Sequence, residues 1–312
     1  MGQWNEAKIG EIAEVKGGKR IPKGRKLIKE PNSHPYIRIR NLGKTKYMQL
    51  NTDYEYVDEE TQQMIARYIV NQGDILISVV GTIGLVGIVG NTLDKANQTE
   101  NCDKIINIKK VLSEYLYYYL VSSFGQDEIK KGTVGAVQPK LPLKNVKDII
   151  VKYPPIKEQK QIVEILSAID EKIELNETIN NNLLQQLHVL YLRLFCDSAM
   201  DTPLGDVVAT TSGGTPSRKH DEYYSDSSIC WVKSKELLGN YIHETEEHIN
   251  DLAIKKSSAK LLPEHSVLIA MYGATVGAYG VISKPMTCNQ AVCALLCNEN
   301  YPYTYLFQIA YE

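Results

Sequence analysis

The sequence predicts an α+β protein made of two similar domains joined by a long helix. Three observations lead to this: the first half of the chain recurs in the second, the repeats carry short apolar runs typical of strands, and one uninterrupted helical stretch separates them. With 312 residues, 43% hydrophobic and 23% charged, the chain is long enough for two domains and too apolar for disorder. We expect two small mixed α/β domains with β-sheets over residues 1–155 and 198–312, and a coiled-coil-type helix over 156–197.

Five segments of the first half recur in the same order in the second half. KIGEIAEVKGGKRIPKG (8–24) is similar to PLGDVVATTSGGTPSRK (203–219), and PYIRIRNL (35–42) is similar to CWVKSKEL (230–237). NQGDILISVVGTIGLVGIV (71–89) matches PEHSVLIAMYGATVGAYGVI (263–282), Asn97-Gln98 matches Asn289-Gln290, and YLYYYL (115–120) matches YTYLFQ (303–308). Ordered matches at nearly one offset predict a tandem duplication of one domain.

The glycine-rich stretch GTIGLVGIVG (81–90) is predicted to be a turn between two strands. Four of its positions recur in the second copy, as the pairs Gly81/Gly273, Thr82/Thr275, Gly84/Gly277 and Gly87/Gly280. A phosphate-binding P-loop needs Lys followed by Ser or Thr and then a helix, whereas Val and Ile here continue a strand pattern. Glycine permits the positive φ of a tight connection. We expect a scaffold turn; a close approach of this turn to a ligand backbone is left open.

The stretch from Glu158 to Phe195 contains no Gly or Pro and reads as one helix that begins just after Pro154 and Pro155. Its 38 residues would extend over about 57 Å at 1.5 Å per residue. Residues spaced alternately by four and three form a heptad seam typical of helix pairing, made of Ile162, Leu166, Ile169, Ile173, Asn176, Asn180, Leu183, Leu187, Leu190 and Leu194. The two asparagines are expected to set the register of pairing, with local tolerance near solvent as the alternative.

Charge and cysteine usage narrow the functional classes. The segment from Lys8 to Lys46 contains twelve basic residues and only three acidic ones, although the net charge of the whole chain is −2. Such a local basic face is typical of a nucleic-acid binder, with a solvated basic loop as the alternative. The six cysteines lack CxxC spacing and paired histidines, which predicts reduced thiols and no metal site. No apolar run approaches the roughly 20 residues that span a bilayer, and Glu6 and Glu11 interrupt any signal peptide.

Two similar domains separated by a long helix that opens with PPIKEQKQIVEIL resemble the specificity subunit of prokaryotic type I restriction–modification systems. The segments that carry the resemblance are GTVGAVQPKLPLKNVKDIIVKYPPIKEQ (132–159), IDEKIELNE (169–177) and the paired starts VKGGKRIPKG and TSGGTPSRK. The resemblance implies a non-catalytic, cytoplasmic protein of prokaryotic defence whose two target recognition domains read a bipartite, gapped site in double-stranded DNA.

The resemblance also implies the partners and their cofactors. Methyltransferase (M) subunits would use S-adenosylmethionine for adenine-N6 methylation, and restriction (R) subunits would use ATP and Mg²⁺, while this chain binds no cofactor and has no catalytic residue. The residues agree with this division, because YPPI at 153–156 lacks the polar residue of an adenine-methylation motif and no Walker lysine is present.

Candidate DNA-binding residues are Arg, Lys, Gln and hydroxyl side chains suited to base edges and phosphates. In the first copy they are Lys19, Arg20, Lys23, Arg38, Arg40, Lys130, Lys131, Gln138 and Lys140. In the second copy they are Thr215, Ser217, Arg218, Lys219, Lys233 and Lys235. Arg38 with Arg40, and Lys233 with Lys235, alternate along strand-like segments, so each pair should share one face. For each residue the alternative is a surface side chain without base contact, and for the matched Gln98 and Gln290 a structural turn bond.

The second copy departs from the family pattern, because it ends at YTYLFQIAYE without the final portion and spacer helix that the resemblance implies. We therefore expect a truncated second half, with the seam pairing with a second copy of this chain in a homodimer or covered by the methyltransferase. Two other functions stay open. One is a coiled-coil assembly scaffold with duplicated protein-binding domains, and the other is a stand-alone enzyme that uses the glycine turns with Cys288 and Cys293.

Overall fold

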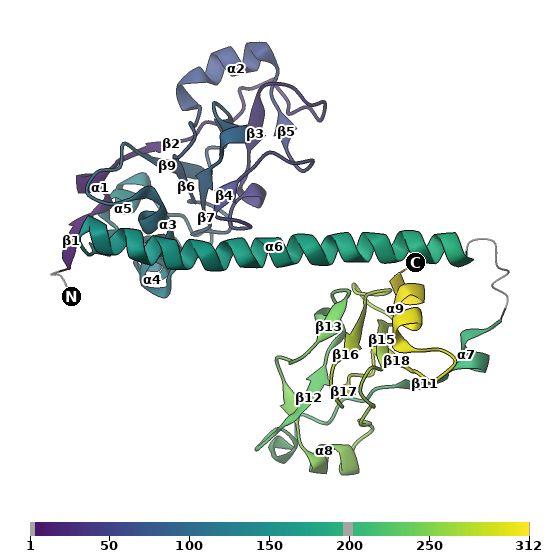
Figure 1. Ribbon diagram of the computed structural model, residues 1–312. Coiled ribbons are helices and arrows are strands. Elements are labelled where there is room, and N and C mark those ends of the chain that lie inside the picture. Colours follow the sequence, from purple (N-terminus) through teal and green to yellow (C-terminus); the bar gives the residue numbers. More distant parts are fainter. Residues whose placement is uncertain (1–3, 196–201, 312) are drawn as a thin grey trace. The chain divides into compact units, whose positions relative to one another are not determined.

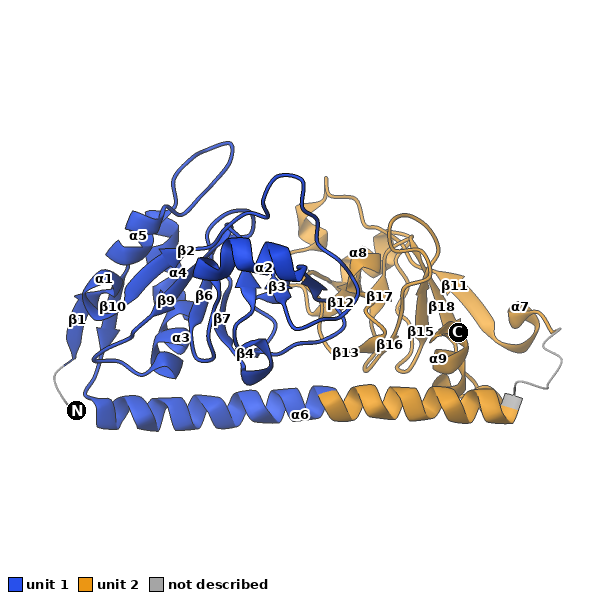
Figure 2. Ribbon diagram, turned by 90° about the horizontal axis from the view of Figure 1, so that it is seen from above, with its two compact units in different colours: residues 1–177 blue, residues 178–312 orange. Residues whose placement is uncertain are grey.

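The computed structural model describes residues 4–195 and 202–311. The chain divides into two compact units, unit 1 (Met1–Glu177) and unit 2 (Thr178–Glu312), coloured separately in Figure 2. Each unit contains a five-stranded and a three-stranded sheet. The predicted class, two tandem α+β domains with a long helix between the sheets, is therefore confirmed. Cys196, one of the predicted reduced thiols, lies outside the described residues.

Unit 1 is built on a five-stranded sheet with the strand order β2-β9-β6-β7-β4. Neighbouring strands are antiparallel except β4, which runs parallel to β7. In the three-stranded sheet β5-β3-β8, β3 is antiparallel to β5 and parallel to β8. The strands are β2 (Glu14–Gly17), β3 (Pro35–Ile37), β4 (Tyr47–Met48), β5 (Glu55–Tyr56), β6 (Ile75–Ser78), β7 (Val86–Val89), β8 (Asn97–Gln98) and β9 (Cys102–Ile106).

The central strand β6 explains the apolar run ILIS, because both of its faces are covered. Side chains alternate between the faces of a strand, so Ile75 and Ile77 join the core that contains Leu116, while Leu76 joins a second cluster with Val89. Several elements complete unit 1: β1 (Asn5–Lys8), which pairs antiparallel with β10 (Ile150–Tyr153), and the helices α1 (Ile9–Ile12), α2 (Glu59–Ile65), α3 (Ser113–Val121), α4 (Ser123–Gly132) and α5 (Leu143–Asp148).

The five-stranded and three-stranded sheets of unit 2 repeat the topology of those in unit 1, which confirms the predicted duplication. Its five-stranded sheet has the order β11-β18-β15-β16-β13 and its three-stranded sheet the order β14-β12-β17. The strands are β11 (Ala209–Ser212), β12 (Ile229–Val232), β13 (Asn240–Ile242), β14 (His248–Ile249), β15 (Val267–Ala270), β16 (Tyr279–Ile282), β17 (Thr287–Cys288) and β18 (Val292–Leu296). Its helices are α7 (Leu204–Val207), α8 (Asp251–Lys256) and α9 (Tyr303–Tyr311), and α9 corresponds to α3.

Strand register corrects one of the sequence matches. Ile37 of β3 lies opposite Gln98 of β8, and the corresponding Val232 of β12 lies opposite Cys288 of β17. Gln98 therefore corresponds to Cys288, and the match of Asn97-Gln98 with Asn289-Gln290 is wrong by two residues. The physical reason is burial. The Gln98 side chain is buried and donates to the Cys102 carbonyl at 3.1 Å, whereas in unit 2 an apolar thiol fills this strand position.

The predicted glycine turn is confirmed in both units. It joins the antiparallel strands β6 and β7, where Gly81 and Gly84 have φ of 77° and 88°. Gly273 and Gly277 between β15 and β16 have φ of 86° and 83°. These left-handed conformations are the ones that glycine adopts without steric cost, so the recurring glycines are explained by the turn.

The predicted long helix is one continuous element, α6 (Ile156–Phe195), of 40 residues (Figure 1). Within unit 1 its first part packs on the core through Ile162 and Val163. Lys46 donates to the Ser167 hydroxyl at 2.7 Å, and the Tyr118 hydroxyl donates to the Asp170 carboxylate at 2.6 Å. Polar contacts thus hold the helix against unit 1 along a face beside the predicted seam.

The last part of α6 packs within unit 2. Leu184 joins the core of this unit, and the rings of His188 and Tyr191 lie 5.3 Å and 6.1 Å from those of Tyr311 and Tyr305. Ile162 and Leu166 of the predicted seam are half-buried. Its remaining members are exposed, namely Ile169, Ile173, Asn176, Asn180, Leu183, Leu187, Leu190 and Leu194. Pairing through this stripe stays a prediction. Among the described residues, no helix has the length and apolarity that crossing a membrane requires.

Candidate nucleic-acid interface

The two arginines at the centre of the predicted interface follow β3 rather than lying on it. β3 ends at Ile37, and Arg38 caps a short 3₁₀ helix, η1 (Ile39–Asn41), that contains Arg40. The prediction that Arg38 and Arg40 share a strand face is therefore wrong. The chain turns because Asn41 accepts a hydrogen bond from the Arg38 backbone N–H at 2.8 Å, a local alternative to strand pairing.

One carboxylate nevertheless brings these two arginines together. Glu55 of β5 accepts from Arg38 Nη1 at 2.6 Å and from Arg40 Nη2 at 3.0 Å. Arg40 also donates to the Asp53 carbonyl at 2.9 Å. The arginine side chains are 45% and 53% exposed, whereas Glu55 is 21% exposed, so the carboxylate lies beneath two solvent-facing guanidinium groups.

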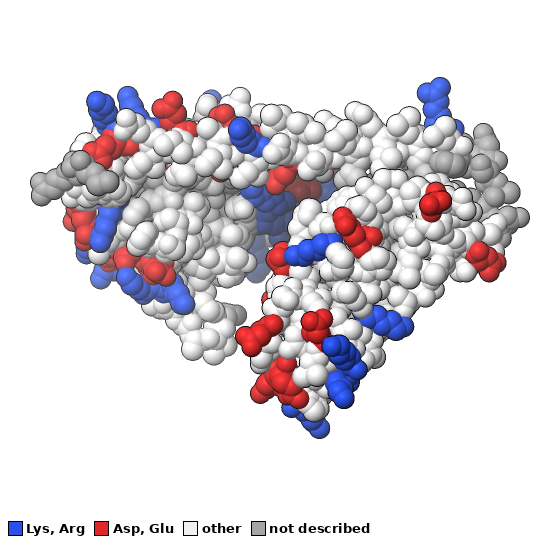
Figure 3. Space-filling model, turned by 60° about the horizontal axis from the view of Figure 1, so that its bottom comes forward, with Lys and Arg blue, Asp and Glu red and all other residues white. Residues whose placement is uncertain are grey.

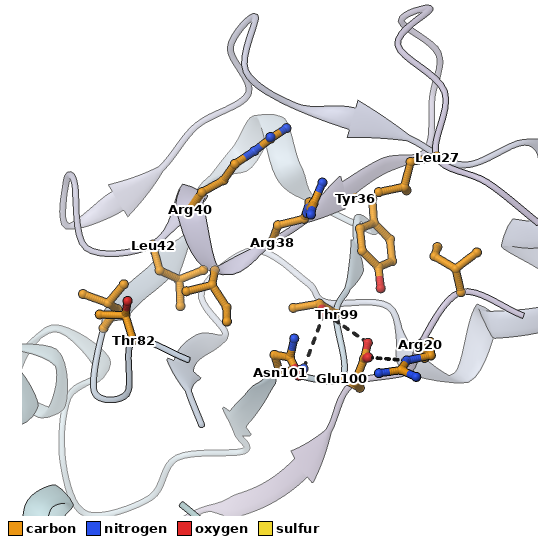
Figure 4. A pocket seen from close by; sticks show the side chains of 13 residues that line it. Arg20, Leu27, Tyr36, Arg38, Arg40, Leu42, Thr82, Thr99, Glu100 and Asn101 are labelled. Atoms are coloured by element: carbon orange, nitrogen blue, oxygen red, sulfur yellow. Dashed lines mark hydrogen bonds and ion pairs between the residues drawn. The ribbon is translucent and has the colours of Figure 1, made fainter. Parts of the chain in front are cut away.

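An open cavity of about 680 Å³ lies beside the two arginines (Figure 4). Arg38, Arg40 and Tyr36 contribute to one side of it, and Thr99 and Glu100 of the segment after β8 contribute to another. The Tyr36 hydroxyl donates to the Lys19 carbonyl at 3.0 Å, and burial raises the pKa of Tyr36 to about 12, so this group stays protonated. The lining thus combines cationic donors and neutral hydrogen-bonding groups with the carboxylate of Glu100, and its donors are of the kind that contact base edges and phosphates.

Arg20 lies in the wall of the same cavity, where it forms an ion pair with Glu100 at 2.7 Å. By strand register, Arg20 and Glu100 correspond to Thr215 and Gln290 of unit 2. Thr215 donates a hydrogen bond to Gln290, so an ionic pair in unit 1 is replaced by a neutral pair in unit 2. Gln290 therefore has a structural bond, the alternative that the sequence left open for it.

Unit 2 repeats the arrangement of two cations on one carboxylate. β12 ends at Val232, and Lys233 caps a 3₁₀ helix, η5 (Ser234–Glu236), that contains Lys235. The predicted shared strand face of these two lysines is wrong for the same reason as in unit 1, since Glu236 accepts from the Lys233 backbone N–H at 2.8 Å. Lys233 donates to Glu247 at 2.8 Å, and Lys233 and Lys235 both contact Glu246, at 3.1 Å and 2.6 Å.

Glu247 also pairs with Arg218, whose guanidinium lies 4.4 Å above the Tyr224 ring and 5.6 Å above the Trp231 ring. Hydrogen bonds from Lys233 and then from Arg218 hold the pKa of Glu247 below its ordinary value. The carboxylate is therefore ionised at neutral pH and holds both cations. Sequence reasoning missed Glu55 and Glu247. Each of these glutamates lies on or next to the strand that pairs with the strand preceding the cations. An acidic residue at that place in the sequence is the signal that could have found them.

The other predicted contacts of unit 1 are dispersed. Lys19 and Lys23 are exposed, and the Lys19 ammonium lies 5.9 Å from the centre of the Tyr68 ring. Lys130 and Lys131 lie in the last turn of α4, where Lys131 pairs with Glu128 at 2.7 Å. Gln138 and Lys140 are exposed in the segment before α5, where the Lys140 backbone pairs with Val80, two residues before cavity-lining Thr82. In unit 2, Ser217 and Lys219 are exposed on the segment that carries Arg218.

Comparisons with known proteins decide the family. Residues 1–185 and 199–312 match the model of the type I restriction modification DNA specificity domain. The chain belongs to this family. It is 27% identical over 294 residues to the type I restriction enzyme MjaIX specificity subunit of Methanocaldococcus jannaschii, which covers 86% of the chain and 66% of that relative. It is 26% identical over 211 residues to the EcoR124I/EcoR124II specificity subunit of Escherichia coli, covering 64% of the chain and 51% of that relative.

A solved structure shows that the fold is shared as well. The chain matches the S subunit of a type I restriction–modification system from M. genitalium with a TM-score of 0.56 and 15% identity, over 99% of this chain and 77% of that one. The chain thus spans about two thirds and about half of the lengths of the two curated relatives.

In this specificity-domain chain several cations of the basic stretch from Lys8 to Lys46 are paired with acidic residues. Lys8 pairs with Asp148, Lys16 with Glu14, and Arg25 with Glu60. Lys46 is buried, where its ammonium lies 5.3 Å from the Tyr118 ring. On the face drawn in Figure 3, basic and acidic side chains are interspersed over a largely uncharged surface. Acidic partners thus offset part of the positive charge of this stretch.

The described thiols do not favour the enzyme alternative. Burial raises the pKa of Cys288 to about 12 and raises that of Cys293, so neither is poised to form the thiolate that acts as a nucleophile. Cys230, Glu244 and His248 place one donor atom each within 4.8 Å of one another, which the sequence did not indicate. Lys284 forms an ion pair with Glu244 at 3.1 Å, so hydrogen bonds and this ion pair already account for the cluster.

Proposed function

We propose that this chain is a non-catalytic DNA-reading subunit of a type I restriction–modification complex. The observation that carries the proposal is the repeated arrangement after β3 and after β12. In this chain of the specificity-domain family, each unit has two cationic side chains that pair with one carboxylate. In unit 1, Arg38 and Arg40 pair with Glu55. In unit 2, Lys233 and Arg218 pair with Glu247. Arg and Lys in such sites contact guanine edges and phosphates.

The two units are proposed to read different half-sites of one bipartite, gapped duplex sequence. Their polar groups differ at corresponding positions, with arginines in place of lysines and the Arg20–Glu100 pair in place of the Thr215–Gln290 pair. A continuous α6 of 40 residues extends over about 60 Å, which exceeds the 34–36 Å of one DNA turn. The helix can therefore separate the half-sites by unread base pairs.

The proposed partners follow from the same role. A methyltransferase subunit carrying S-adenosylmethionine would modify adenine at N6, and a restriction subunit would use ATP and Mg²⁺, all acting on cytoplasmic DNA. The exposed stripe of α6, from Ile169 to Leu194, is proposed to pair with a second copy of the chain or with the methyltransferase. This proposal is supported by the exposure of the seam residues along the stripe, for example 50% for Ile173, 56% for Leu183 and 54% for Leu190.

To test the proposal, the chain together with the methyltransferase subunit of the same system is used to select the duplexes that it binds from a pool of random DNA sequences. A gapped motif that the methyltransferase alone does not select is the expected result. If Arg38 contacts guanine through two hydrogen bonds, Arg38→Ala should lower the discrimination between bases at one position of one half-site by about 1–3 kcal/mol. A pool without sequence preference would contradict DNA reading. A uniform loss of affinity would assign Arg38 to phosphate instead.

A further inference from the structure

Glu55 and Glu247 occupy the same position in the duplicated fold. In unit 1, Glu55 lies opposite Tyr36 on the antiparallel strands β5 and β3. In unit 2, Cys230 lies opposite His248, and the next residue, Trp231, donates its backbone N–H to the Glu247 carbonyl at 3.1 Å. Each glutamate therefore sits beside the last residues of the strand that leads into the 3₁₀ helix with the cations. The carboxylate–cation contact is a repeated feature of the domain rather than an isolated surface pair.

Each carboxylate binds two of the proposed DNA-contacting cations, and the arginines among them keep most of their donors free. A guanidinium has five N–H donors in a planar fork. Arg38 uses Nη1 for Glu55, so its Nε and Nη2 stay available, and Arg40 uses Nη2 for both of its contacts. In unit 2, Glu247 is 32% exposed beneath an Arg218 side chain that is 58% exposed. Lys233 is only 17% exposed and donates to both Glu246 and Glu247, so Arg218 is the solvent-facing cation on Glu247. Each glutamate thus holds arginine side chains whose outer edges face solvent.

This arrangement has two physical consequences for DNA binding. First, a long cation held at one end loses fewer rotamers when it meets a base, so the correctly placed base is favoured over others. Second, each glutamate cancels one positive charge, which weakens the sequence-independent attraction to phosphates. Both effects raise the ratio of specific to non-specific affinity, although the second lowers affinity for DNA in general.

We propose that Glu55 and Glu247 are positioning residues that set the sequence discrimination of units 1 and 2, each by orienting a pair of base-reading cations and by restraining their binding to phosphates. The inference rests on the proposed function, since it concerns how the same surfaces choose among sequences. It predicts a division of labour in which each glutamate governs one half-site and has no effect on the other.

The test uses the full chain with its methyltransferase subunit and the variants Glu55→Gln and Glu247→Gln, which keep side-chain shape and remove the charge. Glu55→Gln should bind random duplex DNA more tightly. Its plot of log affinity against log salt concentration should be steeper by the amount that about one additional phosphate contact adds to the slope. Its ratio of specific to non-specific affinity should fall about tenfold, within the range of one bidentate base contact. Base preference should relax in the half-site of unit 1 alone, and Glu247→Gln should relax the other half-site.

The matched control is Glu30→Gln, which makes the same charge change in unit 1 at an exposed residue for which the described part of the chain shows no ion pair. A purely electrostatic effect would appear equally in this variant. If Glu55→Gln and Glu30→Gln give the same salt dependence and the same motif, the inference is overturned. Because Glu247→Gln probes the same role in the other unit, a folding defect in one variant leaves the inference testable. Failure of the proposed function is distinguishable, since the unmodified chain would then select no motif.

Discussion

Gln159 in the first turn of α6 is expected to be the main polar anchor between this helix and unit 1. Its side chain is fully buried, and its amide makes three hydrogen bonds. Oε1 accepts from the Leu112 backbone N–H at 2.9 Å, and Nε2 donates to the carbonyls of Lys110 and Pro154 at 3.2 Å and 2.9 Å. The glutamine of the PPIKEQ segment thus joins the start of α6 to the residues that precede α3.

Replacing Gln159 by Leu keeps the volume but leaves three backbone groups without their partner. At about 1 kcal/mol for each lost hydrogen bond, the free energy of unfolding of unit 1 should fall by about 3 kcal/mol. Hydrogen–deuterium exchange of unit 1 peptides at increasing urea concentrations measures this loss separately from unit 2. Gln161→Leu, a neighbouring exposed position of the same helix, is the control and should change stability by under about 0.5 kcal/mol. Equal stabilities of the two variants would refute the role of Gln159.

Three further changes test other parts of the structure. Burial raises the pKa of Asp103 to about 6, so this carboxyl ionises more readily in the unfolded chain than in the folded one. Asp103 therefore lowers the free energy of unfolding progressively as the pH rises from about 4 to 6. Asp103→Asn should therefore stabilise unit 1 by about 3 kcal/mol at pH 7 and leave it nearly unchanged at pH 4, as urea denaturation at both pH values would reveal. Gly18→Ala should destabilise unit 1, since a Cβ would lie 2.0 Å from the Thr99 carbonyl oxygen, and thermal unfolding with a midpoint equal to that of the unmodified chain would contradict this. Leu183→Lys with Leu190→Lys should abolish self-association in light scattering if the α6 stripe pairs two copies, whereas an unchanged mass would exclude that pairing.

The repeat and the helix were predictable because they depend on local pattern. Buried β-branched runs such as ILIS and VLIA mark corresponding strands whatever their neighbours are, and the absence of Gly and Pro marks α6. The apolar seam was also readable, although the face of α6 that contacts unit 1 carries the polar residues Gln159, Ser167 and Asp170, which periodicity of apolar residues does not reveal.

The interface was predictable in its cations but not in the way they are held. Arg38 and Arg40 were found from the alternating pattern IRIR, yet a hydrogen bond from Asn41 ends the strand and places them on a 3₁₀ helix. Glu55 was missed because it is separated from Arg38 by seventeen residues and meets it only through the pairing of β5 with β3. The match of the two Asn-Gln pairs failed for a related reason, since strand register rather than residue identity decides which positions correspond.

The proposed role of α6 is to separate two units that read two half-sites, and the length of this helix can be changed directly. Residues 171–183 of α6 are exposed, so seven residues that continue the heptad pattern can be inserted after Glu177. The insertion lengthens the helix by about 10.5 Å, which corresponds to at most about 3 base pairs. Motif selection with the methyltransferase subunit should return the two original half-sites separated by a longer gap. An unchanged gap, or a single uninterrupted motif, would contradict the account.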